Sequence, residues 1–190
     1  AKTPLRGLLS KQYAARLRAK IDPQRAMEAQ TAGEPEECDG DTTYFAVVDK
    51  DGNCVSFIQS LSNAFGSKVV AGDTGILLNN RAGRGFSLEA GHRNVIEPGK
   101  KTMHTLNAYL VCRDGKPWLV GGTPGGDQQP QWNMQVISAV IDHGLNVQQA
   151  AELPRWHSFP GTDPDSADNA LELRLEDRIP ATVRESLAAK

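Results

Sequence analysis

Residues 41–53 are Asp-Thr-Thr-Tyr-Phe-Ala-Val-Val-Asp-Lys-Asp-Gly-Asn, a run in which β-branched and aromatic residues lead directly into a turn signal. Residues 33–41 before it are polar and rich in turn-forming types, so the composition changes at Thr42. A change of this kind is typical of the start of a strand. We therefore expect Thr42 to be the first residue of a buried strand, and Asp51-Gly52 to form a tight hairpin turn after it.

The turn predicts a hairpin in which residues 43–50 pair antiparallel with residues 54–61. This pairing places Thr42 at a strand end beside Ser60 and Ser62 of the partner strand. Hydroxyl side chains are common in strands, so these residues alone fit an ordinary sheet. The alternative is that Thr42 is a nucleophile, and the choice depends on the rest of the chain.

Length and charge limit the classes of function. The chain has 190 residues, of which 39% are hydrophobic, as expected for one globular domain with a proper core. It contains no apolar run of about 18 residues, so no membrane partner is expected. A net charge of −2 with scattered basic residues argues against nucleic acid and favours a small-molecule substrate.

The metal-ligating residue types are too sparse for a recognisable site. Three cysteines without a C-x-x-C pair form neither a disulfide framework nor a zinc ribbon, and four dispersed histidines form no H-x-x-x-H pattern. We expect no metal and no cofactor. The residues concerned are Cys38, Cys54 and Cys112, and His92, His104, His143 and His157.

Helices and strands are both predicted outside the first hairpin. An apolar stripe at every fourth residue predicts an early helix that Asp22-Pro23 ends. A second hairpin is expected around Asp114-Gly115, and together the hairpins suggest a substantial antiparallel sheet. The residues of the stripe are Leu9, Tyr13, Leu17 and Ile21, and the strands of the second hairpin are expected at 106–113 and 117–120. A loop is expected at residues 81–86, an apolar helix from Trp132 that Gly144 closes, and a short helix capped by Asn146 and stopped by Pro154. A strand at 171–176 and a helix whose first position is Pro180 complete the prediction. This mixture indicates an α+β fold.

The glycine loop Pro124-Gly125-Gly126 precedes the apolar helix. It is either a plain strand-to-helix turn or a cradle of backbone N–H groups for an oxyanion, since glycine allows close approach and positive φ. A phosphate loop is excluded, because no Gly-Lys-Ser/Thr follows.

The run from Thr42 resembles the start of the small subunit in the γ-glutamyltranspeptidase family, whose precursors cleave themselves immediately before such a threonine. The resemblance continues in the family's order over nearly the whole chain. Its further motifs are Phe65-Gly66-Ser67, residues 71–80 (Ala-Gly-Asp-Thr-Gly-Ile-Leu-Leu-Asn-Asn), Pro124-Gly125-Gly126, and residues 142–147 with 151–155 (Asp-His-Gly-Leu-Asn-Val and Ala-Glu-Leu-Pro-Arg).

This resemblance implies the four-layer αββα sandwich of the N-terminal nucleophile hydrolases, with cleavage between Asp41 and Thr42. Residues 1–41 would then be the C-terminal end of the large-subunit region with an exposed linker before the cleavage point, and residues 42–190 the small catalytic subunit. The partner would be the large subunit from the same precursor, in a heterodimer or a dimer of heterodimers. We expect a cytoplasmic protein, or a periplasmic one if an upstream region carries a signal.

The resemblance also implies the chemistry. Freed by cleavage, the Thr42 α-amine, with a reference pKa of about 8, can take the proton of its own hydroxyl. Ser60 would orient that hydroxyl, and Gly125 and Gly126 would form the oxyanion hole. Ser62 occupies a position near the nucleophile where the family usually has Asn.

Two departures from the family's pattern bear on the substrate. Arg81 stands where γ-glutamyl enzymes carry Gln or Glu, and Arg84 stands where they carry the Asp that holds the α-ammonium group of the substrate. His104 and Thr105 replace a Ser-Ser pair. This combination is most similar to the oxamate amidohydrolase branch, because arginines attract a carboxylate and repel an ammonium group. The alternative for the two arginines is that they are solvated loop charges. The alternative functions are a γ-glutamyl hydrolase or transpeptidase, a glutaryl-type acylase, or a non-catalytic binding domain.

Overall fold

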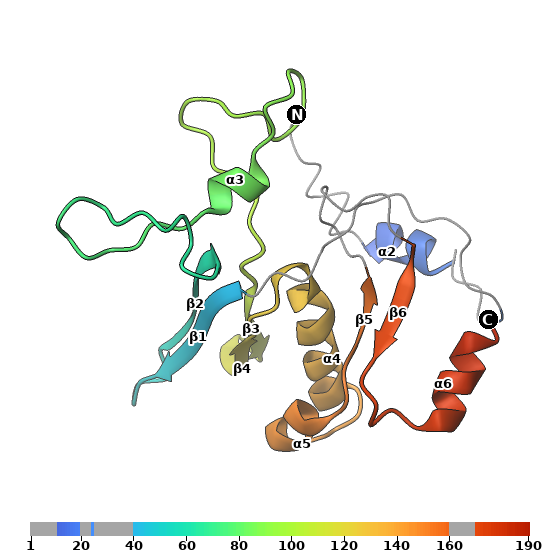
Figure 1. The fold of residues 1–190 in the computed structure, drawn as a ribbon. Helices are drawn as coiled ribbons and strands as arrows, with labels where there is room; N and C mark the ends of the chain where they lie inside the picture. Colours follow the sequence, from blue (N-terminus) through green and yellow to red (C-terminus); the bar gives the residue numbers. More distant parts are fainter. Residues whose placement is uncertain (1–10, 20–23, 25–39, 160–169) are drawn as a thin grey trace.

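The computed structural model describes residues 11–19, 24, 40–159 and 170–190 (Figure 1). Helices and antiparallel strands alternate along the described chain, which confirms the α+β class. No helix in these ranges is long and apolar enough to cross a membrane. The elements are α2 (Lys11–Arg18), β1 (Gly40–Val48), β2 (Cys54–Asn63), α3 (Arg81–Gly85), β3 (Ala108–Arg113), β4 (Lys116–Gly122), the 3-10 turn η1 (Gly126–Gln128), α4 (Gln129–Ile141), α5 (Val147–Glu152), β5 (Trp156–Phe159), β6 (Glu172–Leu175) and α6 (Ala181–Ala188).

The first predicted hairpin is present, but β1 ends at Val48 instead of Lys50, so the register is offset by two residues from the predicted pairing of 43–50 with 54–61. β1 pairs antiparallel with β2, and the pairing places Thr42 opposite Ser60. The turn is held by the Asp49 carboxylate, which accepts hydrogen bonds from the backbone N–H groups of Asp51 at 2.9 Å and Asn53 at 2.8 Å. β1 begins two residues earlier than predicted, at Gly40. Asp41 and Thr42 are therefore consecutive residues of one strand.

The second predicted hairpin is confirmed as β3 and β4, but the prediction that the two hairpins form one substantial sheet is wrong. In the described residues each hairpin forms its own two-stranded sheet, and β5 with β6 forms a third. The late strand was predicted at 171–176 and is present as β6. Its partner β5 was not predicted, because four residues carry too little periodicity to be distinguished from a loop.

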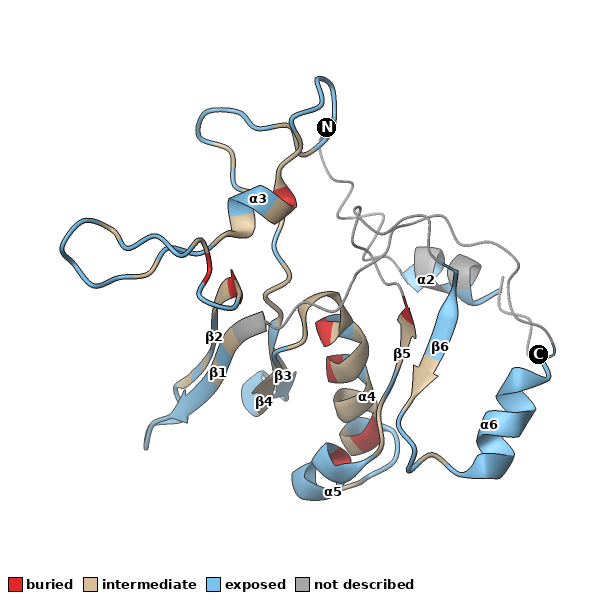
Figure 2. Ribbon diagram, in the orientation of Figure 1, coloured by how far each residue is buried: buried red, intermediate tan, exposed pale blue. Residues whose placement is uncertain are grey.

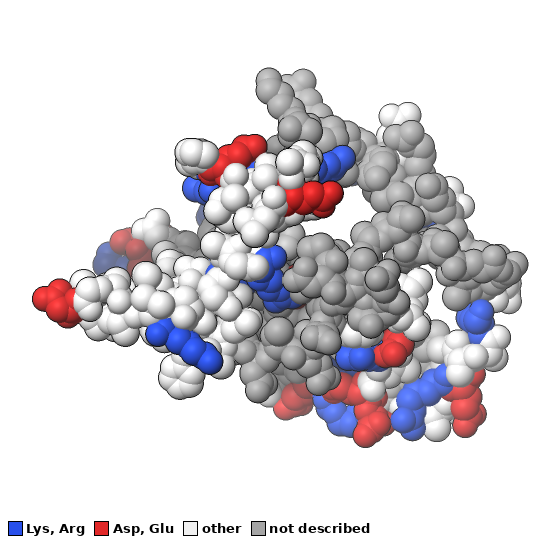
Figure 3. Space-filling view, turned by 45° about the horizontal axis from the view of Figure 1, so that its top comes forward, with Lys and Arg blue, Asp and Glu red and all other residues white. Residues whose placement is uncertain are grey.

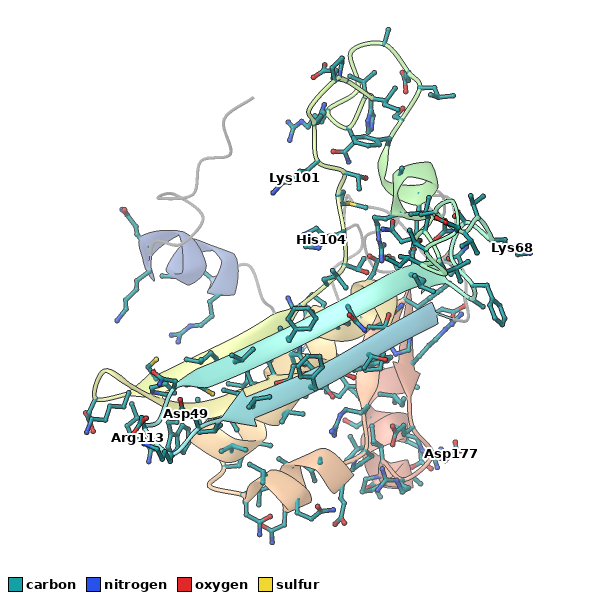
Figure 4. All side chains as sticks on the ribbon, turned by 90° about the vertical axis from the view of Figure 1, so that its left-hand side faces the viewer. Asp49, Lys68, Lys101, His104, Arg113 and Asp177 are labelled. Carbon is teal, nitrogen blue, oxygen red and sulfur yellow. The ribbon has the colours of Figure 1, made fainter. Side chains whose placement is uncertain are left out.

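Two of these sheets lie face to face. Figures 1 and 4 agree that β3 and β4 lie between the first hairpin and α4. The Ser56 hydroxyl of β2 donates to the Gly121 carbonyl of β4 at 3.3 Å. The Tyr44 ring of β1 lies directly against Gly122, where a Cβ would come within 2.5 Å of Cδ2. Figure 4 shows the turns of both hairpins, marked by Asp49 and Arg113, at the same end.

Helix α4 is held mainly by buried amides. Gln129 and Asn133 are 1% and 5% exposed, and both hydrogen-bond Asn107 just before β3. Figure 2 shows buried residues concentrated on α4 and α5. α5 begins with a capping box between Asn146 and Gln149, which confirms Asn146 as its N-cap. The α4 helix therefore connects the glycine loop to the segment before β3.

Three sequence predictions need correction. The strand at Thr42 is not buried on both faces, because outward-facing residues such as Phe45 are exposed. Residues 81–86 are not a loop: residues 81–85 form the one-turn helix α3, whose Gly85 packs so closely on Thr102 that no Cβ would fit. Pro180 precedes α6 instead of occupying its first position. The early helix is present as α2, while Leu9 and Ile21 of its predicted stripe, and residues 30–39 of the linker, lie outside the described residues.

Replacing Gly122 by alanine is expected to destabilise the protein by about 1–3 kcal/mol, because the added Cβ must displace the Tyr44 ring between the two sheets. Denaturant unfolding measures this. Gly83→Ala is the control, since a Cβ there meets no atom within 4 Å, and it should change stability by less than about 0.5 kcal/mol. Equal effects from the two variants would contradict this account of the packing.

Candidate active site

Thr42 and Ser60 form a hydroxyl pair at the end of the first hairpin. Thr42 Oγ1 lies 2.8 Å from Ser60 Oγ, and the backbone N–H of Ser62 donates to the same Ser60 oxygen at 2.9 Å. The register of the hairpin shifts here, since Asp41 faces Ser62 while Thr42 faces Ser60. Leu61 is the extra residue of the resulting β-bulge. Bulges of this kind often redirect side chains beside active sites.

Ser62 has an unusual conformation for its residue type. Its φ of +76° lies in the left-handed region, which costs about 1 kcal/mol for a residue with a side chain. The residue is 6% exposed, and its hydroxyl has no hydrogen-bond partner in the described part of the chain. This conformation aims the Ser62 N–H at Ser60. It also leaves a buried hydroxyl next to the Thr42 pair.

The short helix α3 is anchored to the same end of β2. The Asn63 N–H donates to Asn80 Oδ1 at 3.0 Å, and the Asn80 N–H donates to the Leu61 carbonyl at 3.1 Å. Arg81 follows directly as the first residue of α3. The sequence predicted neither the helix nor its anchor, and the two bonds attach the segment that carries both arginines to the end of β2.

Arg81 and Thr105, both predicted as substrate-binding residues, are in contact. Arg81 Nη2 donates to Thr105 Oγ1 at 3.2 Å. His104 differs from its neighbour: it is exposed, and it makes no hydrogen bond to any residue that the structure describes. Figure 4 shows His104 on the extended segment that leads from Lys101 toward the sheets. Its predicted companion Thr105 is thus joined to the site, whereas His104 is not.

The glycine loop has the backbone that only glycine adopts easily. Gly125 has φ +136° and Gly126 has φ +54°. A Cβ on Gly125 would overlap the ring of Trp132, which lies one turn into α4. His157 of β5 supports this ring edge-on, with centroids 5.7 Å apart. Burial, and then the charge of Arg174, lowers the pKa of His157, which favours its neutral form.

Arg84 is paired with a residue that the sequence analysis did not single out. Its Nη2 lies 2.9 Å from Asp127 Oδ2, and the two side chains are 17% and 4% exposed. Asp127 directly follows Gly126, and a Cβ built on Gly126 would lie 4.0 Å from Arg84 Nη1. The missed signal was an acid immediately after the glycine pair, which one sequence cannot match to a particular base.

The hairpin packing brings these parts to one region. Gly122 lies three residues before Gly125, and its neighbour Tyr44 lies two residues after Thr42. The region therefore combines a hydroxyl pair, a glycine loop with positive φ and two guanidinium groups, which are the elements needed for nucleophilic attack on an acyl group. The described residues contain no group of three or more His, Cys, Asp or Glu side chains that could hold a metal ion. Basic and acidic side chains are intermingled on the face shown in Figure 3.

Comparisons with known proteins identify relatives of the chain. The chain is 49% identical over 156 residues to the glutathione hydrolase-like YwrD proenzyme of Bacillus subtilis, which covers 82% of this chain. It is 45% identical over 118 residues to the oxamate amidohydrolase proenzyme of Klebsiella pneumoniae, covering 62% of this chain and 22% of that protein. Among solved structures, cephalosporin acylase from Bacillus halodurans matches 98% of this chain and 32% of its own, with a TM-score of 0.77 and 37% identity.

The chain spans 29% of the length of the Bacillus subtilis relative, so it corresponds to only part of such a proenzyme. The match to the protein family described as gamma-glutamyltranspeptidase, in contrast, extends over residues 1–190. The chain therefore belongs to the γ-glutamyltranspeptidase family.

Proposed function

We propose that this chain carries the catalytic residues of a self-cleaving amide hydrolase whose nucleophile is Thr42. The observation that carries the proposal is the 2.8 Å contact between Thr42 Oγ1 and Ser60 Oγ, formed at the strand bulge. A threonine hydroxyl is a weak nucleophile unless a base and an orienting group are close to it. Ser60 supplies the orienting group, and cleavage supplies the base.

Cleavage begins when the Thr42 hydroxyl attacks the Asp41 carbonyl carbon. The bond from that carbonyl to the Thr42 nitrogen breaks, and the nitrogen takes up the hydroxyl proton to become a free amine. Water then hydrolyses the resulting ester, which releases the Asp41 carboxyl group and restores the hydroxyl. In turnover the amine takes the Thr42 hydroxyl proton as the oxygen attacks a substrate amide, and it passes this proton to the leaving nitrogen when the amide bond breaks; water then hydrolyses the acyl-enzyme.

The remaining site residues take supporting roles. The N–H groups of the Gly125–Gly126 loop would donate to the oxyanion of each tetrahedral intermediate, where one donor is worth about 2.7–4 kcal/mol. The buried hydroxyl of Ser62, which has no partner among the described residues, is suited to contact the substrate. These roles follow from the family resemblance, and the backbone angles of the loop support them.

The outer face of the first hairpin supports the proposed four-layer fold and the partner. Phe45 lies opposite Phe57, and Val47 opposite Val55, so the four side chains share one face. All four are between 43% and 55% exposed, while the other face packs on β4. The layers of the chain are, in order, α4, the β3–β4 sheet and the β1–β2 sheet. Helices of a large subunit that covered this apolar face would add a fourth layer and complete an αββα sandwich. Residues 1–41 would be the end of that subunit and 42–190 the small subunit of a heterodimer.

The proposed substrate is a small amide that carries a carboxylate, with oxamate, hydrolysed to oxalate and ammonia, as the first candidate. The charge of Arg84 is balanced by Asp127, so Arg81 with Thr105 is the pair that we assign to the substrate carboxylate. The identity to an oxamate amidohydrolase proenzyme supports this choice. A γ-glutamyl substrate is the second candidate, favoured by the 49% identity to a glutathione hydrolase-like proenzyme.

The full-length precursor is expected to be cut between Asp41 and Thr42, which intact mass and N-terminal sequencing would show. Thr42→Ala should abolish both cleavage and turnover, because both steps use the same oxygen. The matched control is Thr43→Ala, whose side chain lies on the exposed side of β1, and it should still be cut. A fully active enzyme with an intact Asp41–Thr42 bond would refute the mechanism.

Gly126→Ala should lower kcat by about 100-fold or more, since a shifted N–H no longer meets the oxyanion. Gly72→Ala is the matched control: its φ of +55° equals that of Gly126 within a degree, so both variants carry the same backbone strain. Steady-state kinetics and thermal unfolding would be measured together. If both variants lose stability equally and activity equally, the glycine pair is only a turn.

Hydrolysis of oxamate should exceed release from γ-glutamyl-p-nitroanilide, since Arg81 attracts a carboxylate and repels an α-ammonium group. Arg81→Gln should reduce kcat/KM for oxamate by about 10–100-fold, the value of a charged hydrogen bond. The exposed Arg93, changed to Gln, serves as the control for total charge. A preference for the γ-glutamyl compound, with no effect of Arg81→Gln, would favour the second candidate.

A further inference from the structure

We propose that Asp127 is a positioning residue, which holds the Gly125–Gly126 backbone in its working orientation through the ion pair with Arg84. The inference rests on the proposed function of the glycine loop. It assigns a role to a residue outside the hydroxyl, glycine and substrate-carboxylate sites described above. It also changes the role of Arg84 from a substrate contact to half of a structural pair.

The geometry places this ion pair at the loop itself. Asp127 is the middle residue of the η1 turn, directly after Gly126, and its Oδ2 accepts from Arg84 Nη2 at 2.9 Å. Arg84 belongs to α3, which is anchored to the end of β2 through Asn80. The pair therefore ties the glycine loop to the strand that carries Ser60. On its other side the loop rests on the Trp132 ring beneath Gly125.

A loop with two positive φ angles needs such restraints. Glycine loses more conformational freedom on folding than any other residue, so two successive glycines are held in place only by contacts on either side. The Trp132 ring restrains Gly125 by packing, but a Cβ on Gly126 would meet only Gln128 and Arg84 atoms, at 3.8 and 4.0 Å. The neighbouring Asp127 side chain, 4% exposed, supplies the directional contact at Gly126.

Electrostatics is a second reason why both residues of the ion pair are needed. A carboxylate beside an oxyanion hole opposes the negative charge that develops in the transition state. Arg84 compensates that charge at 2.9 Å, and with side chains 17% and 4% exposed the pair is little screened by solvent. An acid at position 127 is therefore compatible with oxyanion chemistry only while the arginine is present. The two residues should act as a unit.

The test is a double-mutant cycle in the full-length precursor, using Asp127→Asn, Arg84→Gln and the double variant. Each single change removes one member of the buried ion pair and leaves the other charged, whereas the double variant replaces both members by neutral amides. We expect Asp127→Asn to lower kcat by about 10–100-fold with KM changed by less than about threefold, as loss of alignment predicts. The double variant should be faster than Asp127→Asn.

A matched control separates this effect from any loss of an ion pair. Arg178 and Glu176 also lie 2.9 Å apart, but they are 62% and 45% exposed and lie between β6 and α6. Glu176→Gln should leave kcat and KM unchanged. Thermal unfolding of each variant identifies one that has lost its fold.

Hydrogen exchange gives a readout that does not depend on activity. Peptides covering residues 121–131 should exchange about 10-fold faster in Asp127→Asn than in wild type, and the double variant should recover part of that protection. Unchanged exchange, losses of kcat that multiply in the double variant, or an effect confined to KM would each overturn the inference. A wild-type precursor that is inactive on all amides would instead refute the proposed function, and the exchange data would still decide the role of Asp127.

Discussion

Two hairpins can pack face to face this closely only where one strand lacks a side chain, and Gly122 provides that place. The Tyr44 ring occupies the space that a Cβ would need. Tyr44 follows Thr42 by two residues and Gly122 precedes Gly125 by three, so this contact joins the strand of the threonine to the strand that leads into the glycine loop. The hydroxyl pair at the β-bulge and the glycine loop are thus connected through the packing of the two hairpins.

The charges around the site have a different balance from the one that the sequence suggests. Two arginines in a short segment predict a strongly positive pocket, but Arg84 is neutralised by Asp127. Arg81 instead donates to the Thr105 hydroxyl. If the proposed substrate is right, its carboxylate would be bound by Arg81 together with Thr105. Such an arrangement would distinguish a carboxylate from an ammonium group without a large net field, and charges of both signs are intermingled on the face shown in Figure 3.

Local chemistry was sufficient to predict the parts of the fold that depend on neighbours in sequence. Asp51-Gly52 correctly indicated the first hairpin, and Asn146 correctly indicated a helix start, because turns and caps are decided within a few residues. The exact register was not predicted: β1 ends at Val48 instead of Lys50, so Thr43 faces Gln59 and not Leu61. The helix α3 was missed because it depends on distant contacts from Asn63 and Thr102. The ion pair to Asp127 joins residues 43 positions apart, and only the folded chain shows it.

The apolar outer face of β1 and β2 has a consequence for how such a protein is made. Phe45 and Phe57 stack with ring centroids 4.9 Å apart on a surface that water reaches, and exposed patches of this kind promote aggregation. Two separately synthesised subunits would have to find each other before the patch met a copy of itself. Linking them in one polypeptide raises the effective concentration of the covering segment to about the millimolar range, whatever the expression level. Postponing scission until after folding would then act as a safeguard of assembly as well as a way to expose an amine.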